Sequence, residues 1–143
     1  MGQQQLLLII LGVIIVGIAV AVGITMFQDN AISANKDAVI NDLVQISAKA
    51  QQFFRKPTSL GGGGNTYNGL TTIGTLVSTT FSDNDNGRYS VLASGSNDTM
   101  VTLIGTGKSQ NPDASYPQIT MVVSPTQNTL SAWTSVNTLP AVQ

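Results

Sequence analysis

Residues 105–109, Gly-Thr-Gly-Lys-Ser, form the first of three short patterns whose residue types could do chemistry. They match the last part of a loop that wraps phosphate groups, in which backbone amides and a lysine hold the anion. The complete loop needs another glycine five residues before Gly107, where the chain has Thr102. It also needs a helix after the serine, but Asn111 and Pro112 follow. We therefore interpret the segment as the end of a strand followed by a turn.

The second pattern, Asp-Asn-Asp-Asn-Gly at residues 83–87, is similar to the start of a calcium-binding loop. A loop of that kind ends on a glutamate that binds the cation through both carboxylate oxygens. The sequence contains no glutamate. We therefore interpret residues 83–87 as a solvated turn, and we predict no metal site and no cofactor site.

The third pattern, Asn97-Asp98-Thr99, is a sequon for N-linked glycosylation. It follows directly on the turn-forming residues Ser94-Gly95-Ser96, so we expect it at the protein surface. Asn97 is therefore a candidate glycosylation site.

The missing residue types remove the usual general acid or base and exclude thiol nucleophiles and zinc-thiolate sites. The chain has no histidine, which is the usual general acid or base near neutral pH, and no cysteine to act as a nucleophile or zinc ligand. Its many serine and threonine hydroxyls therefore lack their ordinary base, and Lys108 alone is a poor substitute. Six basic residues against seven acidic ones form no basic stripe. We expect no catalytic site and no binding to nucleic acid.

The element that dominates the sequence is an apolar stretch at residues 6–27, LLLIILGVIIVGIAVAVGITMF, which we call the apolar segment. It contains no charged side chain and exceeds the 18 or so residues that indicate a transmembrane helix. An ordinary cleaved secretory signal begins with basic residues, whereas this chain begins Met-Gly-Gln-Gln-Gln. We therefore expect a helix of roughly 30 Å that is held in a membrane.

The helical pattern continues beyond the apolar segment. No proline or glycine occurs in residues 24–56, and Pro57 ends the pattern. The sequence predicts one continuous helix from about Gly2 to Phe54, on the order of 80 Å long, with residues 28–56 amphipathic. The predicted apolar stripe contains Ile32, Val39, Leu43, Ile46, Ala50 and Phe53, while Lys36, Asp42, Lys49 and Gln52 are expected mostly off it.

The remainder of the chain is polar and reads as β structure. A glycine-rich linker is predicted at residues 57–66, followed by a β-rich head at 67–143. We expect an antiparallel meander of about four strands, packed on the amphipathic half of the helix, which makes the fold class α+β. The candidate strands are Tyr67–Thr72, Arg88–Ala93, Thr99–Thr106, Gln118–Ser124 and Leu130–Thr134, with the second and third forming a hairpin.

This order of elements resembles the type IV pilin class, which includes archaeal pilins and secretion pseudopilins. In that family a short polar N-terminus, here residues 1–5, runs straight into an apolar stretch, here Leu6–Phe27. An amphipathic extension then packs on a small β-rich head. The resemblance covers roughly the first 60 residues and is one of architecture. It implies copies of the chain itself as partners in a helical filament, and a prepilin peptidase and an assembly ATPase as its machinery.

Two features of the N-terminus depart from the family pattern. Bacterial members usually carry a glutamate near the mature amine, which pairs with a neighbour's terminal ammonium. If Met1 is the mature first residue, Gln5 stands there, and its neutral amide accepts a weaker hydrogen bond. Archaeal-type members often begin with glutamine after a glycine, which fits cleavage between Gly2 and Gln3. A leader already removed and a leader never present both stay open.

Three glycines lie within the apolar segment. Small residues let membrane helices approach closely, but spacings of five and six are not the GxxxG dimer pattern. Alternatively, each glycine weakens the helix by about 1 kcal/mol relative to alanine, which would let the helix stretch in a filament. The family's usual helix-breaking proline is missing here. The candidate assembly residues are Met1, Gln5, Leu11, Gly12, Gly17 and Gly23.

These patterns favour a structural subunit of an extracellular, type IV pilus-like filament, held in the inner or cytoplasmic membrane before assembly. Membrane and filament core are both dry apolar environments, so the same surface suits both. A membrane-anchored β-rich binding or adhesion domain that does not polymerise is the first alternative. A minor pseudopilin of a secretion system is the second, and a small membrane-bound enzyme has no supporting residues.

Overall fold

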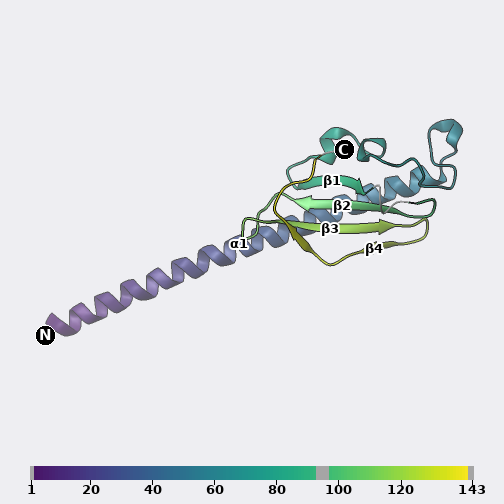
Figure 1. Cartoon of the computed structure of the whole chain (residues 1–143). Coiled ribbons are helices and arrows are strands. Elements are labelled where there is room, and N and C mark those ends of the chain that lie inside the picture. Colours follow the sequence, from purple (N-terminus) through teal and green to yellow (C-terminus); the bar gives the residue numbers. More distant parts are fainter. Residues whose placement is uncertain (1, 93–96, 142–143) are drawn as a thin grey trace. The chain divides into compact units, whose positions relative to one another are not determined.

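The fold is the predicted α+β class, with one long N-terminal helix and a small antiparallel sheet (Figure 1). The computed structural model describes residues 2–92 and 97–141. Helix α1 spans Gly2–Arg55. The chain divides into two compact units, Met1–Ser33 and Ala34–Gln143. We call the second of them the head unit.

The last part of α1 belongs to the core of the head unit. Val39, Leu43, Ile46 and Ala50 have no exposed surface, which confirms these positions of the predicted apolar stripe. They pack against buried side chains from the sheet, including Leu103 of β2 (Val101–Gly107) and Met121 of β3 (Tyr116–Val123). The head unit therefore completes its core with its own helix, as the small size of the β-rich part suggested.

Five strands form the sheet, and every strand pair is antiparallel. The strand order is β1-β2-β3-β4, with β5 also paired to β3. Buried and partly exposed side chains alternate along the whole of β3, which is the pattern of a strand with one face on a core. The predicted hairpin is confirmed as β1 and β2, while Ala93 lies outside the described residues. The strands are β1 Gly87–Leu92, β2 Val101–Gly107, β3 Tyr116–Val123, β4 Asn128–Leu130 and β5 Thr134–Val136.

Glycines on β1 and β2 bring the sheet unusually close to α1. A methyl group added at Gly105 would lie 2.9 Å from side-chain atoms of both Val39 and Leu43. One added at Gly87 would lie 2.5 Å from the Thr106 carbonyl oxygen. One at Gly107 would collide with the Asn35 side chain. Two glycines of the Gly-Thr-Gly-Lys-Ser pattern, Gly105 and Gly107, therefore serve packing between the helix and the sheet.

The predicted strand at Tyr67–Thr72 is wrong. Tyr67 and Leu70 are buried, but they lie in a turn closed by a hydrogen bond from the Leu70 amide to the Tyr67 carbonyl. Gly69, with φ of 90°, allows the turn. A short 3₁₀ helix, η2 (Ile73–Thr75), follows, and helix α2 spans Thr79–Ser82. Asn68 and Gly69 are the two central residues of the turn.

The predicted strand at Leu130–Thr134 is also wrong in its bounds. The structure has two three-residue strands, β4 and β5, which pair with different parts of β3. Between them the Ser131 hydroxyl donates to the Ala132 carbonyl and also bonds the Thr120 side chain. The far edge of the sheet is thus split, and the simple meander of four strands is corrected to a sheet of five.

The glycine-rich segment caps the end of α1. The amides of Gly63, Gly64 and Asn65 donate to the carbonyls of Phe53, Lys56 and Phe54 respectively. The positive φ angles of Gly64 and Asn65 permit this return of the chain. The 3₁₀ helix η1 (Thr58–Leu60) forms the outer part of the loop. The helix end is therefore satisfied by backbone donors from the segment that was predicted as a linker.

Replacing Gly63 with alanine should lower the stability of the head unit by about 2 kcal/mol, because the new methyl group overpacks a filled site. That methyl group would collide with the Thr66 carbonyl oxygen and would lie 2.9 Å from the Phe53 ring. Thermal unfolding of the full chain in detergent, followed by circular dichroism, measures the change. The matched control is Gly74→Ala, where the methyl group meets nothing within 4 Å. Equal unfolding temperatures for the two variants would contradict this account.

Candidate functional site: the apolar segment and the polar network of the head unit

The apolar segment is exposed along its entire length. Every described residue from 2 to 31 is exposed, so none of the residues that the structure describes covers this stretch of α1. Leu7, Val13 and Phe27 expose 68%, 68% and 76% of their surface. Large apolar patches on soluble proteins mark contacts with a membrane or with another protein. By length and composition, α1 is the one helix in the described part of the chain that could cross a membrane.

The predicted assembly residues share this exposed helix. Gln5 and Leu11 lie within α1, and Leu11 is 49% exposed. A methyl group added at Gly12, Gly17 or Gly23 would meet no atom within 4 Å. Nothing in the described chain therefore requires glycine at these three positions. Met1 lies outside the described residues.

Helical geometry brings only two of these glycines to one face. At about 100° per residue, Gly12 and Gly23 differ by roughly 20° around the helix axis, whereas Gly17 lies about 140° from Gly12. The three do not form a single small-residue stripe. This arrangement agrees with their lack of a GxxxG spacing.

In the head unit, one buried carboxylate accepts several hydrogen bonds, that of Asp42 on α1. Its position was expected mostly off the buried stripe, and that expectation is wrong, because Asp42 is only 7% exposed. Its Oδ2 atom accepts hydrogen bonds from the Tyr89 hydroxyl at 2.7 Å, from Asn84 Nδ2 at 2.9 Å and from Asn86 Nδ2 at 3.0 Å. One helical carboxylate therefore binds three donors from β1 and from the turn before it.

In this environment the pKa values of Asp42 and Tyr89 shift in opposite directions. Burial by itself raises the pKa of Asp42, but the hydrogen bonds from Asn86, Tyr89 and Asn84 outweigh it, and the pKa lies below its ordinary value. Burial, followed by the hydrogen bond to Asp42 and its negative charge, raises the pKa of Tyr89. At neutral pH Asp42 is therefore an ionised acceptor and Tyr89 a protonated donor.

The turn that resembled a calcium loop supplies two of these donors. The Asn84 side-chain oxygen accepts hydrogen bonds from the amides of Asn86 and Gly87, both at 3.0 Å, and so fixes the turn. The Asn86 carbonyl also accepts a hydrogen bond from Asn35 Nδ2 at 2.8 Å. Residues 84–87 thus bind the helix at two places. In the described residues, no three Asp, Glu, His or Cys side chains gather as a metal site.

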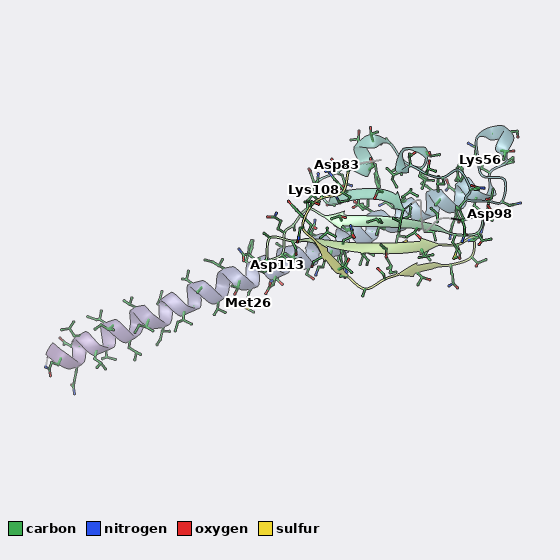
Figure 2. The ribbon with its side chains drawn as sticks, in the orientation of Figure 1. Met26, Lys56, Asp83, Asp98, Lys108 and Asp113 are labelled. Carbon is green, nitrogen blue, oxygen red and sulfur yellow. The ribbon has the colours of Figure 1, made fainter. Side chains whose placement is uncertain are left out.

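A second polar cluster, centred on Asp83, lies at the surface beside this turn (Figure 2). Lys108 Nζ lies 2.6 Å from Asp83 Oδ1, and Arg88 Nε lies 3.1 Å from Asp83 Oδ2. The Lys108 hydrogen bond holds the pKa of Asp83 below its usual value, with smaller contributions from the two positive charges. The lysine of the Gly-Thr-Gly-Lys-Ser pattern is therefore engaged in an ion pair.

Asn97 lies at the opposite end of the sheet. It is exposed, in the turn that leads into β2. The neighbouring Asp98 carbonyl accepts a hydrogen bond from the Tyr67 amide, which joins this turn to the segment after the α1 cap. Figure 2 shows Asp98 and Lys56 at one end of the head unit and Asp83 and Lys108 at the other.

Comparison of the chain with protein-family models, with curated proteins and with solved structures gives no match.

Proposed function

We propose that this protein is a structural subunit of an extracellular filament, stored in the membrane through its apolar segment and assembled by burying that segment among copies of itself. The observation that carries the proposal is a helix with two different halves. One half carries the exposed apolar segment, and the other half contributes its buried face to the core of the head unit. The filament would place the apolar segments inside and the head units outside.

The energy available from the apolar segment supports this reading. Complete burial of a large apolar side chain contributes about 1.5–3 kcal/mol, and those between Leu6 and Phe27 are about half to three-quarters exposed. Each therefore has on the order of 1 kcal/mol left to gain. The total is comparable with the whole stability of an ordinary domain, about 5–15 kcal/mol. Such a surface requires a dry environment, first lipid and then other subunits.

The continuity of α1 favours a filament over a simple anchor. A membrane-tethered binding domain needs only a membrane helix and a flexible connection. Here α1 is helical without interruption from Gly2 to Arg55, and residues 24–56 contain no glycine or proline. The same helix that leaves the apolar segment supplies Val39 and Leu43 to the core of the head unit. A force on the apolar segment would therefore pass through α1 to the head unit, as a fibre subunit requires.

Imaging of material sheared from the cell surface tests this proposal. Cells that make the protein are sheared, the supernatant is imaged by cryo-electron microscopy, and its main protein is identified by intact mass. We expect thin filaments in which this chain is the bulk component. The intact mass also shows whether the mature chain begins at Met1 or Gln3. Monomers that are recovered only with detergent, without any fibres, would instead support the membrane-anchored binding domain.

A further inference from the structure

The sequon at Asn97 is held in a defined turn. The Asn97 side-chain oxygen accepts hydrogen bonds from the Thr99 amide at 3.0 Å, the Thr99 hydroxyl at 3.2 Å and the Met100 amide at 2.9 Å. The Asn97 amide in turn donates to the Met100 carbonyl at 2.7 Å. All the polar contacts of the side chain to described residues use its oxygen. No described residue accepts a hydrogen bond from its Nδ2 atom.

The middle residue of the sequon fixes this turn to the rest of the head unit. The Asp98 carbonyl accepts from the Tyr67 amide at 3.1 Å, and the Asp98 carboxylate accepts from the Thr66 hydroxyl at 3.2 Å. Tyr67 is fully buried and packs on Phe54 of α1, with ring centroids 4.9 Å apart. The turn is thus supported from the core while Asn97 and Thr99 are exposed.

The turn also lies at the end of the sheet that is away from the start of the head unit. β2 begins beside it, at Val101, and ends at Gly107, which touches Asn35 near the start of the head unit. Asn97 is therefore at the end of the sheet where α1 stops, away from the end that α1 enters. A glycan at Asn97 would stay clear of the part of the head unit that is nearest in sequence to the apolar segment.

We propose that Asn97 carries an N-linked oligosaccharide, added to the head unit on the outer side of the membrane. The inference relies on the proposed function only for this location, because the head unit of an extracellular filament subunit lies outside the cytoplasm. Thr99 contributes by its hydroxyl, which holds the carboxamide oxygen and leaves the nitrogen as the reacting atom. The sequence contains no second Asn-X-Ser/Thr pattern.

The transfer is balanced with a lipid-phosphate-linked oligosaccharide as donor. The Asn97 Nδ2 atom forms a bond to the anomeric carbon of the first sugar and loses one proton to a base of the transferase. The bond between that carbon and the phosphate oxygen of the donor breaks. The lipid phosphate leaves with the electron pair, and no oxidant or reductant takes part.

Mass spectrometry of the native protein tests the assignment. The full chain is purified from the membranes of the cells that make it, and its intact mass and its peptides are measured. We expect the mass of an oligosaccharide on the peptide that contains Asn97, and an intact mass that exceeds that of the Thr99→Ala chain by the same amount. An unmodified Asn97 peptide as the main species would overturn the proposal.

Two substitutions at Thr99 separate the sequon from the fold. Thr99→Ala removes the hydroxyl but keeps Asn97 and its bonds to the backbone amides, and it should lose the added mass. Thr99→Ser keeps a hydroxyl and should retain it. Equal modification of the two variants would show that the sequon is not the determinant.

The glycan and the filament are measured independently, the first by mass in the membrane fraction and the second by imaging. A glycosylated chain in cells without fibres would contradict the filament and support the glycan. Filaments built from unmodified chains would do the reverse. Both outcomes are read from the same culture by imaging and by mass.

Discussion

Replacement of Leu11 by lysine should strongly reduce filament formation and lower the fraction of the chain that is held in the membrane. A lysine within a membrane helix costs about 3 kcal/mol by insertion measurements, and the contribution of the leucine is lost as well. In a filament each subunit would bury this charge among apolar neighbours. A loss of about 3 kcal/mol per subunit corresponds to roughly a 100-fold higher concentration for assembly. The yield of sheared filaments and the membrane-bound fraction measure the effect.

The matched control for Leu11→Lys is Gln28→Lys. Gln28 is also exposed on α1, but it lies directly after the apolar segment, where a lysine can reach the membrane surface. This variant should form filaments in nearly normal amounts. A normal filament yield from Leu11→Lys would contradict the proposal that the apolar segment is the buried core of the fibre. Equal losses in both variants would point to an effect of charge anywhere on the helix.

The long helix and its buried positions could be predicted because they depend on local patterns. An apolar run at residues 6–27 and the spacing of Val39, Leu43, Ile46 and Ala50 each report the helix directly, and the structure has α1 at Gly2–Arg55. Likewise two strand-like segments separated by a short polar turn identified the hairpin of β1 and β2. In these elements the local preference and the tertiary environment agree.

The segment after the α1 cap was misread because its buried side chains are three residues apart. Tyr67, Leu70 and Ile73 are each 1% exposed. A strand would place alternate residues on the core, but a 3₁₀ helix places every third residue on the same side. β-branched and aromatic residues favour strands in general, so residue preference pointed the wrong way. Packing on α1 and β1 decided the outcome.

The role of Asp42 could not be read from its own neighbourhood. Its spacing from Val39 and Ile46, three and four residues, does fit the buried face of the helix. A charged residue at such a position is ordinarily expected in solvent. Burial is possible only because Asn84, Asn86 and Tyr89, more than 40 residues away, bring three donors to one oxygen. Only the paired strands and the turn reveal that arrangement.

Asp42→Ala should destabilise the head unit by about 3–5 kcal/mol. Hydrogen bonds to a charged group contribute about 1.5–3 kcal/mol each, and buried donors that are left without an acceptor add their own cost. The single tryptophan, Trp133, packs against the core and reports unfolding of the full chain in detergent by its fluorescence. Asp37→Ala removes an exposed carboxylate from the same helix and is the matched control. Equal stability of the two variants would show that the network contributes nothing.

The pH dependence of stability separates the contribution of the Asp42 charge from the contribution of its packing. The folded state holds the pKa of Asp42 below 3.8, its value in the unfolded chain, so folding favours the ionised carboxylate. The stabilisation is therefore complete above about pH 4–5 and is lost as the pH falls through the folded-state pKa. The pKa values of Asp83 and Asp113 are also lowered, so both residues lose stabilisation on acidification. These losses occur equally in the wild type and in Asp42→Ala. The stability difference between wild type and Asp42→Ala should consequently shrink on acidification. A difference that stayed constant down to pH 2 would mean that Asp42 supports the fold by packing alone.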